Sequence, residues 1–295
     1  MPKLLFYTDE YTLPLPEGHR FPIQKYRMLR ELLEQDGRFR FELAPLAERE
    51  VIELAHDAAY VDAFESGTLS AQAIRRIGFP WSVGLVKRTL ASVGGTLAAT
   101  REALENGWGG NLAGGTHHAF RGEGSGFCVF NDIAVAAKWL QVSGHAKRIA
   151  VIDLDVHQGD GTAQIFADDP SVLTFSMHCE VNFPFRKQQS KIDVALAEGV
   201  GDEEYLRQVE EVLPRVFGFE PEFVFYQAGV DVLATDTLGK LKLSPEGVKR
   251  RDEMVIAATK NAGVPMVITI GGGYSKPIEA TAKAHAETFR TALNR

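Results

Sequence analysis

The segment from Val151 to Thr162 joins a run of apolar residues to side chains that can bind a metal or transfer protons. Asp153, Asp155 and His157 occupy every second position, and Asp160 follows after a glycine. Side chains alternate between the two faces of a strand, so the first three should project to one side. Because unpaired charges at the end of a buried strand are costly, we expect a bound cation or another partner to neutralise them.

Four further polar residues follow strand-like segments that are far apart in the chain. His117 and His118 come after NLAGGT, Asp231 comes after FVFYQAGV, and Tyr274 comes after MVITIGGG. In open α/β sheets, ligands bind beyond the carboxyl ends of the strands. The sequence therefore predicts that these side chains meet the segment around Asp155 at one edge of a sheet.

A metal site with three protein ligands could be formed by Asp155, His157 and Asp231. Two carboxylates and one imidazole suit a divalent cation, and three protein ligands leave a coordination position open for water or substrate. Taken alone, the DVH run is explained equally well by a buried His–Asp pair that holds a loop. Asp231 and the two adjacent histidines favour the metal site, and the ligand set would accept iron(II) as well as zinc.

His117 and His118 could serve as general base and general acid for amide hydrolysis beside a metal-bound water. Each imidazole needs an acceptor for its other ring nitrogen, and Asp153 and Asp160 are the carboxylates available for this purpose. Tyr274 could donate a hydrogen bond to the developing oxyanion and polarise the carbonyl together with the metal. The sequence does not decide which histidine is the base and which is the acid.

The segments that must position these residues alternate between strand-like and helix-like patterns. VIDL, FVFY and MVITI are almost continuously apolar, which is typical of strands buried on both faces of a parallel sheet. Helices are predicted over 48–77 with a break at Gly67, and over 83–105 despite the Gly94–Gly95 pair. The alternation predicts one α/β domain over 1–295, a doubly wound, mostly parallel sheet with helices on both faces.

The composition limits the classes of function. The net charge of −7 argues against a nucleic-acid-binding surface, and no apolar run is long enough for a membrane span. The two cysteines, Cys128 and Cys179, lack the spacing of a zinc site, and the N-terminal segment lacks the pattern of a signal peptide. These features predict a cytoplasmic protein with neither nucleic acid nor membrane as a partner.

Five motifs, in order GGTHHA, GSGFCVFNDIAVAA, DLDVHQGDGT, QAGVDVLATDTLG and GGGY, resemble the zinc-dependent histone deacetylase family. This family includes acetoin-utilisation proteins and acetylpolyamine amidohydrolases. The similarity covers about Leu4 to Thr288 and is greatest to bacterial relatives of class IV type. It implies an arginase/deacetylase-like fold, one zinc ion per chain on the ligand set above, and a structural potassium ion near Asp153 and the carbonyls of Ser176 and Met177.

The resemblance also assigns roles that agree with the residue chemistry. It implies catalytic roles for His117, His118 and Tyr274, and supporting roles for Asp153 and Asp160. It implies a narrow substrate tunnel lined by Gly126, Phe127, Phe183 and Leu238. Polyamine-selective relatives carry an acidic residue where Leu238 stands, so the sequence favours a substrate other than a cationic polyamine.

Together these features predict a zinc-dependent amidohydrolase that removes an acetyl or other acyl group from the ε-amine of lysine in a protein or peptide. Three alternatives remain open. One is the same chemistry on an acetylpolyamine or another small acylated amine. The second is a ureohydrolase with a binuclear manganese site, and the third is a non-catalytic protein that binds an acyl ligand. The sequence does not predict the oligomeric state.

Overall fold

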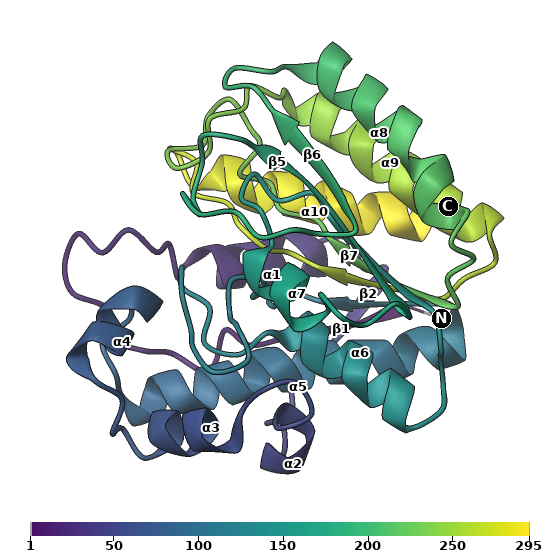
Figure 1. Ribbon diagram of the computed structural model, residues 1–295. Coiled ribbons are helices and arrows are strands. Elements are labelled where there is room, and N and C mark those ends of the chain that lie inside the picture. Colours follow the sequence, from purple (N-terminus) through teal and green to yellow (C-terminus); the bar gives the residue numbers. More distant parts are fainter. Residues whose placement is uncertain (1, 295) are drawn as a thin grey trace.

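The computed structural model describes residues 2–294 and is built around one sheet in which every strand pairing is parallel (Figure 1). The strand order is β2-β1-β3-β8-β7-β4-β5-β6. The strands are β1 (Lys3–Tyr7), β2 (Phe39–Leu43), β3 (Trp108–Asn111), β4 (Ile149–Asp153), β5 (Val172–Cys179), β6 (Ile192–Leu196), β7 (Phe223–Gln227) and β8 (Met266–Thr269).

Helices cover both faces of this sheet. In Figure 1, α5 and α6 lie on one side, while α8, α9 and α10 lie on the other. The helices are α1 (Lys25–Glu34), α2 (Arg49–Ile52), α3 (Ala58–Glu65), α4 (Ala71–Ile77), α5 (Val83–Asn106), α6 (Asp132–Val142), α7 (Asp160–Ile165), α8 (Asp202–Phe217), α9 (Pro245–Asn261) and α10 (Glu279–Asn294). The predicted α/β class, a parallel sheet with helices on both faces, is confirmed.

Three of the strands that precede the candidate site are buried along their whole length. Every residue of β4, β7 and β8 is buried, as expected for near-continuous apolar strands covered by helices on both faces. Serines begin two of the covering helices: the side chains of Ser82 and Ser244 accept hydrogen bonds from the amides of Leu85 and Gly247. Such N-caps satisfy amides that have no partner within the helix.

The Gly94–Gly95 pair allows α5 to pack closely against two other segments. A Cβ atom at Gly94 would lie 1.9 Å from the carbonyl oxygen of Pro45, and one at Gly95 would lie 2.9 Å from the Asn111 amide group. Any larger residue would push the helix away from β3. The glycines thus weaken helix propensity but permit the helix–strand contact.

Two regions differ from the sequence-based prediction. The predicted break at Gly67 is present between α3 and α4. The part before it is two helices, α2 and α3, because the chain leaves helical geometry after Ile52 and the amide of Asp57 donates to the carbonyl of Arg121. Strand β6 was not predicted. It is a short edge strand with exposed positions, and its IDVAL sequence lies within a polar segment.

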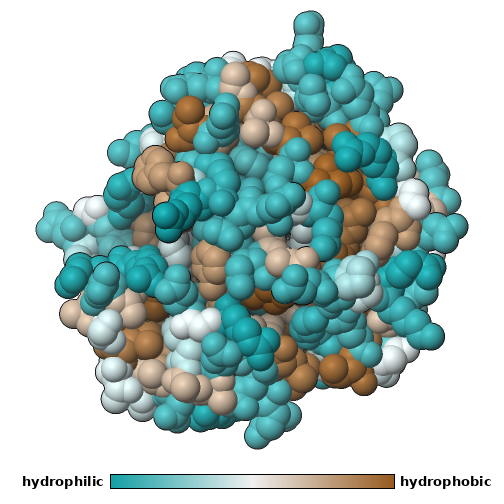
Figure 2. Space-filling model, viewed as in Figure 1, coloured by the Kyte–Doolittle hydropathy of each residue, from teal (hydrophilic) through white to brown (hydrophobic). Residues whose placement is uncertain are grey.

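The surface gives no sign of a membrane span. Within 2–294, no helix combines the length and the apolar character that crossing a membrane requires. The face shown in Figure 2 is mostly hydrophilic, and its hydrophobic residues gather in small groups among polar ones.

Candidate metal centre and active site

Asp155, His157 and Asp231 come together beyond the ends of β4 and β7. One ligand atom from each lies within 4.8 Å of the others, and this is the one such group among the residues that the structure describes. The His157 Nδ1 atom is 3.0 Å from Asp155 Oδ1 and 3.1 Å from Asp231 Oδ2. Because β4 and β7 are neighbouring parallel strands, with Asp153 beside Gln227, their following loops meet at the same edge. The predicted convergence is present.

Main-chain amides hold the two carboxylates of this group in place. The Val156 amide donates to Asp231 Oδ1 at 2.9 Å, and the Gly272 amide donates to Asp155 Oδ2 at 2.7 Å. A Cβ atom at position 272 would lie 1.9 Å from Asp231 Oδ2, so only glycine permits this approach. The His157 amide also donates to Asp155 Oδ1 at 3.0 Å, so three main-chain amides orient the two carboxylates.

The electrostatics of the group fit a divalent cation. Burial and the neighbouring Asp155 charge raise the pKa of Asp231 to about 7, whereas the charges of His117 and His157 hold the pKa of Asp155 well below its usual range despite burial. Two buried carboxylates at this distance repel each other unless a proton or a cation lies between them. The donor set of two oxygens and one nitrogen is one that zinc accepts.

The two adjacent histidines are each held by an aspartate of the opening motif. His117 Nδ1 is 2.7 Å from Asp153 Oδ2, and His118 Nδ1 is 2.6 Å from Asp160 Oδ1. The ring centroids of the two histidines lie 4.0 Å apart. With Nδ1 donating to a carboxylate, Nε2 of each ring is the atom available for proton transfer. The predicted pairing of these four residues is therefore what the structure shows.

The pKa values of the two imidazoles shift in opposite directions. Burial lowers the pKa of His117, but the charges of Asp153 and Asp155 outweigh burial and raise it to about 9. Burial and the neighbouring His117 charge lower the pKa of His118 to about 4. The part of the His117 shift that comes from Asp155 depends on that carboxylate being free of a cation. The environment thus favours the protonated form of His117 and the neutral form of His118.

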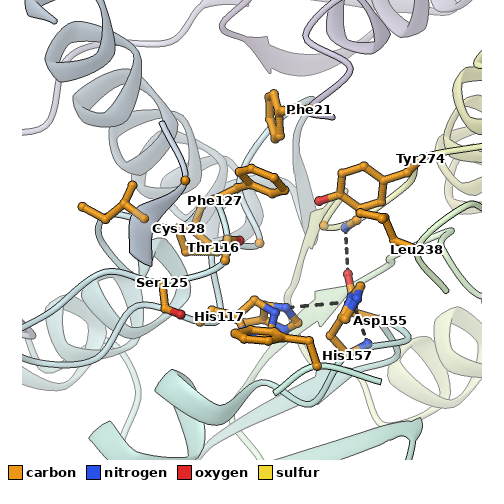
Figure 3. A pocket seen from close by; sticks show the side chains of 18 of the residues that line it. Phe21, Thr116, His117, Ser125, Phe127, Cys128, Asp155, His157, Leu238 and Tyr274 are labelled. Carbon is orange, nitrogen blue, oxygen red and sulfur yellow. Dashed lines mark hydrogen bonds and ion pairs between the residues drawn. The ribbon is translucent and has the colours of Figure 1, made fainter. Parts of the chain in front are cut away.

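Tyr274 stands across the cavity from the histidines. Its hydroxyl points into the cavity toward Phe127, whose ring centroid is 6.3 Å from that of Tyr274 (Figure 3). Burial raises the pKa of the Tyr274 phenol well above its usual value, and the Asp231 and Asp155 charges act in the same direction. The hydroxyl therefore keeps its proton and can donate a hydrogen bond.

All of these groups lie in or beside one cavity of about 730 Å³. The predicted tunnel residues are among its lining: Gly126, Phe127, Phe183 and Leu238. Phe183 packs edge-on against His118, with ring centroids 4.9 Å apart. Asp155 is the only acidic lining residue, while the basic ones are Arg20, Arg75, Arg76, Arg88 and Lys240. The cavity is thus aromatic near the histidines and basic elsewhere.

The structure adds three residues that sequence reasoning did not select. Lys25 is buried, and its Nζ atom donates to the carbonyl oxygens of Gly271 at 3.2 Å and Gly273 at 3.5 Å, next to Tyr274. Asp236 bonds to the Tyr274 amide, and Arg88 lines the cavity. In the sequence Lys25 and Arg88 stand in ordinary helical contexts, without a motif that marks them. Asp236 lies within the motif QAGVDVLATDTLG, which could have pointed to it, but no role was assigned to it.

The expected potassium site near Asp153 stays a prediction. Asp153 and Ser176 are paired in register on β4 and β5, and the Asp155 amide donates to Asp153 Oδ1 at 3.1 Å. These contacts neither require nor oppose a monovalent cation.

Comparisons with known proteins agree with this geometry. The histone deacetylase domain family matches residues 19–292. An uncharacterised protein of Picosynechococcus sp. is 49% identical over 293 residues, which covers 97% of each chain. Histone deacetylase 2 of Arabidopsis thaliana is 32% identical over 289 residues, covering 92% of this chain and 74% of the relative.

Two further matches bear on the activity class and on the fold. A histone deacetylase-like amidohydrolase of Pseudomonas aeruginosa is 29% identical over 289 residues, covering 89% of this chain and 74% of the relative. The crystal structure of the HDA15 HD domain superposes with a TM-score of 0.81 at 23% identity, covering 99% of this chain and 93% of that domain. This likeness shows the fold, which is of the arginase/deacetylase type. The chain thus belongs to the histone deacetylase family of hydrolases.

Proposed function

We propose that this protein is a zinc-dependent amidohydrolase that removes an acetyl or other acyl group from the ε-amine of lysine in a protein or peptide. The observation that carries the proposal is the pair of buried imidazoles, each held by its own aspartate, beside a three-ligand metal group. Asp155, His157 and Asp231 would hold the zinc ion. We further propose that residues 1–295 form one catalytic domain.

The residues of the chain supply the proton transfers and the orientation of the substrate. When bound, zinc supplies a Lewis acid that activates water and polarises the substrate carbonyl. One imidazole of the pair accepts a proton through Nε2, and one donates a proton to the departing amine. Asp153 and Asp160 keep the two rings oriented and stabilise their charged forms. Tyr274 donates its hydroxyl hydrogen bond to the carbonyl oxygen as negative charge develops there.

The aromatic part of the cavity suits an alkyl chain that carries the acylated amine. Phe127 and Phe183 both line the cavity, and Phe183 stands beside His118. Apolar rings remove the methylenes of a lysine side chain from water while leaving its backbone at the mouth. Leu238 adds an apolar contact at the same entrance.

Two alternatives are less well supported. An acetylpolyamine would bring positive charge to a cavity with several basic residues and one acidic residue, which is a metal ligand. A binuclear manganese ureohydrolase needs further carboxylate ligands, but Asp153 and Asp160 are engaged by the histidines. A small acylated amine without added positive charge remains an alternative to a peptide.

The test is acetate release from an acetyl-lysine peptide by metal-stripped protein titrated with zinc. We expect activity to rise to a plateau near one zinc per chain. Absence of release at every zinc level, with longer acyl-lysine peptides also inert, would contradict the proposal. The same protein would then be assayed with acetylpolyamines and, after manganese loading, for urea release from guanidino substrates.

A further inference from the structure

The cavity beside the metal group is also lined by a set of buried residues. We name the part of the cavity lined by Phe21, Tyr26, Arg88 and Ser92 the Arg88 chamber. Arg88 is only 8% exposed, and Tyr26 and Ser92 are also buried, whereas Phe185 at the mouth is 89% exposed. Arg88 and Ser92 lie one turn apart on α5. The chamber is therefore formed by buried lining residues and not by the exposed rim of the cavity.

The guanidinium of Arg88 has no anionic partner in residues 2–294. Its contacts there are with two aromatic rings: the guanidinium carbon is 5.1 Å from the Phe21 centroid and 4.9 Å from the Tyr26 centroid. The Lys25 ammonium lies near the same rings, 5.9 Å and 5.4 Å from their centroids, and bonds only to carbonyl oxygens. Two buried cations thus surround one pair of rings without a carboxylate.

This arrangement is costly for the protein alone. A buried charge without a partner strongly destabilises the folded state, and a contact with a ring face offsets only a small part of that cost. An anion that enters the chamber relieves the cost. A guanidinium presents paired N–H donors that match the two oxygens of a carboxylate.

We propose that the Arg88 chamber binds the free carboxylate of a dicarboxylic acyl group, so that the substrates include amines carrying short acyl chains such as succinyl. This inference rests on the proposed deacylase function and specifies the acyl group. The acyl carbonyl lies at the metal group, the amine and its alkyl chain occupy the aromatic entrance, and the distal carboxylate reaches Arg88. Hydrolysis adds water across the amide: a C–O bond forms, the C–N bond breaks, and the products are a dicarboxylate and the free amine.

The first experiment compares two acyl groups that differ in charge and hardly in size. One peptide sequence is prepared with succinyl-lysine, with its neutral amide counterpart succinamoyl-lysine, and with acetyl-lysine. We measure kcat/KM for each with the zinc-loaded protein. We expect succinyl-lysine to be favoured over succinamoyl-lysine by about 10- to 100-fold, the range of a charge-assisted hydrogen-bond pair.

Variants then locate the source of this preference. Arg88→Met should reduce the succinyl kcat/KM by about 10- to 100-fold while changing the acetyl value by less than about threefold. Arg88→Lys keeps the charge but loses the paired donors, so it should retain part of the preference. Arg101→Met is the matched control, because Arg101 is an exposed residue on the same helix that stacks on Trp139. It should leave all three substrates unchanged.

Several results would overturn the inference. Equal rates for succinyl-lysine and succinamoyl-lysine in the wild-type protein would do so without any variant, even if Arg88→Met failed to fold. Equal losses on acetyl and succinyl substrates in Arg88→Met would assign Arg88 a structural role. If Arg88→Met only weakened inhibition by added acetate, the bound carboxylate would be that of the product. Hydrolysis of acetyl-lysine in any of these cases would leave the proposed deacylase function intact.

Discussion

The carboxylate of Asp236 accepts a hydrogen bond from the main-chain amide of Tyr274 at 2.6 Å. Its other oxygen accepts from the amides of Leu238 and Gly239, each at 2.8 Å. One side chain thus ties the loop after β7, which carries Leu238, to the loop after β8, which carries Tyr274. The position of the tyrosine hydroxyl depends on this link between two segments.

Asp236→Ala should therefore reduce kcat by about 10- to 100-fold with little change in KM, because a small displacement of a catalytic group is costly. Steady-state kinetics on an acetyl-lysine peptide would measure both constants, and zinc content should equal that of the wild type. Thr237→Val is the control: it removes one exposed hydrogen bond to the Tyr274 carbonyl and should have a smaller effect. A raised KM with unchanged kcat would assign Asp236 to the substrate entrance instead.

Tyr274→Phe should reduce kcat by about 100- to 1,000-fold, because the proposed mechanism places the hydroxyl where charge develops in the transition state. KM and zinc affinity should remain close to the wild-type values, since the ring and its packing are kept. The comparison uses the same peptide and the same zinc loading. Unchanged turnover would exclude Tyr274 from the mechanism.

Asp231→Asn should make the metal-free protein more stable while abolishing its stabilisation by zinc. Burial and the Asp155 charge raise the pKa of Asp231 to about 7, so the folded state holds a proton more tightly than the unfolded state. The stability contributed by this protonated carboxyl is complete below about pH 4 and is lost as the pH rises toward 7. At pH 8 with a chelator, the variant should melt at least about 2 °C higher than the wild type.

Near pH 4 the difference between the two metal-free proteins should narrow, which provides the internal control. Zinc should raise the melting temperature of the wild type and leave that of Asp231→Asn unchanged. A variant that melts lower than the wild type at pH 8 would show that the Val156 hydrogen bond to Asp231 outweighs the charge repulsion.

Protonation of His56 should lower the stability of the folded protein in mild acid. The ring is buried, its Nε2 accepts the Asn131 amide at 2.8 Å, and its Nδ1 lies 3.2 Å from the Arg121 carbonyl. Burial lowers the pKa of His56 to about 4, below the ordinary value of 6.5, so the unfolded state binds the proton more tightly. The free energy of unfolding should fall by about 3 kcal/mol as the pH drops from 6.5 to 4.

Urea unfolding at several pH values measures how steeply the free energy of unfolding depends on pH. His56→Gln should be less stable at pH 7 but should show a flatter profile between pH 6.5 and 4. His145→Gln, which removes an exposed histidine, should keep the wild-type slope. Equal slopes in all three proteins would show that other groups determine the acid sensitivity.

The residues that could be predicted from the sequence are those whose position follows from a strand end. Asp155, His157 and Asp231 follow buried apolar strands, so parallel pairing alone brings them to one edge of the sheet. The partners of His117 and His118 could be predicted because Asp153 and Asp160 were the carboxylates left without another role.

Lys25 and Arg88 could not be predicted, because their positions in the site arise from contacts between distant segments. Lys25 bonds to the carbonyl groups of Gly271 and Gly273, which lie 246 and 248 positions later in the sequence. No local pattern distinguishes it from the solvated lysines of other helices. The edge strand β6 was not predicted for a related reason. Its own sequence is short and mixes polar with apolar residues, so its strand structure depends on pairing with β5.

The position of β8 determines when during synthesis the protein can become active. β8 lies between β3 and β7 and is the only strand that joins the group β2-β1-β3 to the group β7-β4-β5-β6 among the described residues. Of the described strands it is also the last to leave the ribosome. Until residues 266–269 emerge, the two groups of strands lack the strand that joins them, and the segment that carries Tyr274 has not been synthesised. A chain truncated before β8 would hold the three residues proposed to bind the metal but would lack both Tyr274 and the central strand. Under the proposed mechanism, premature termination should therefore not release a working hydrolase.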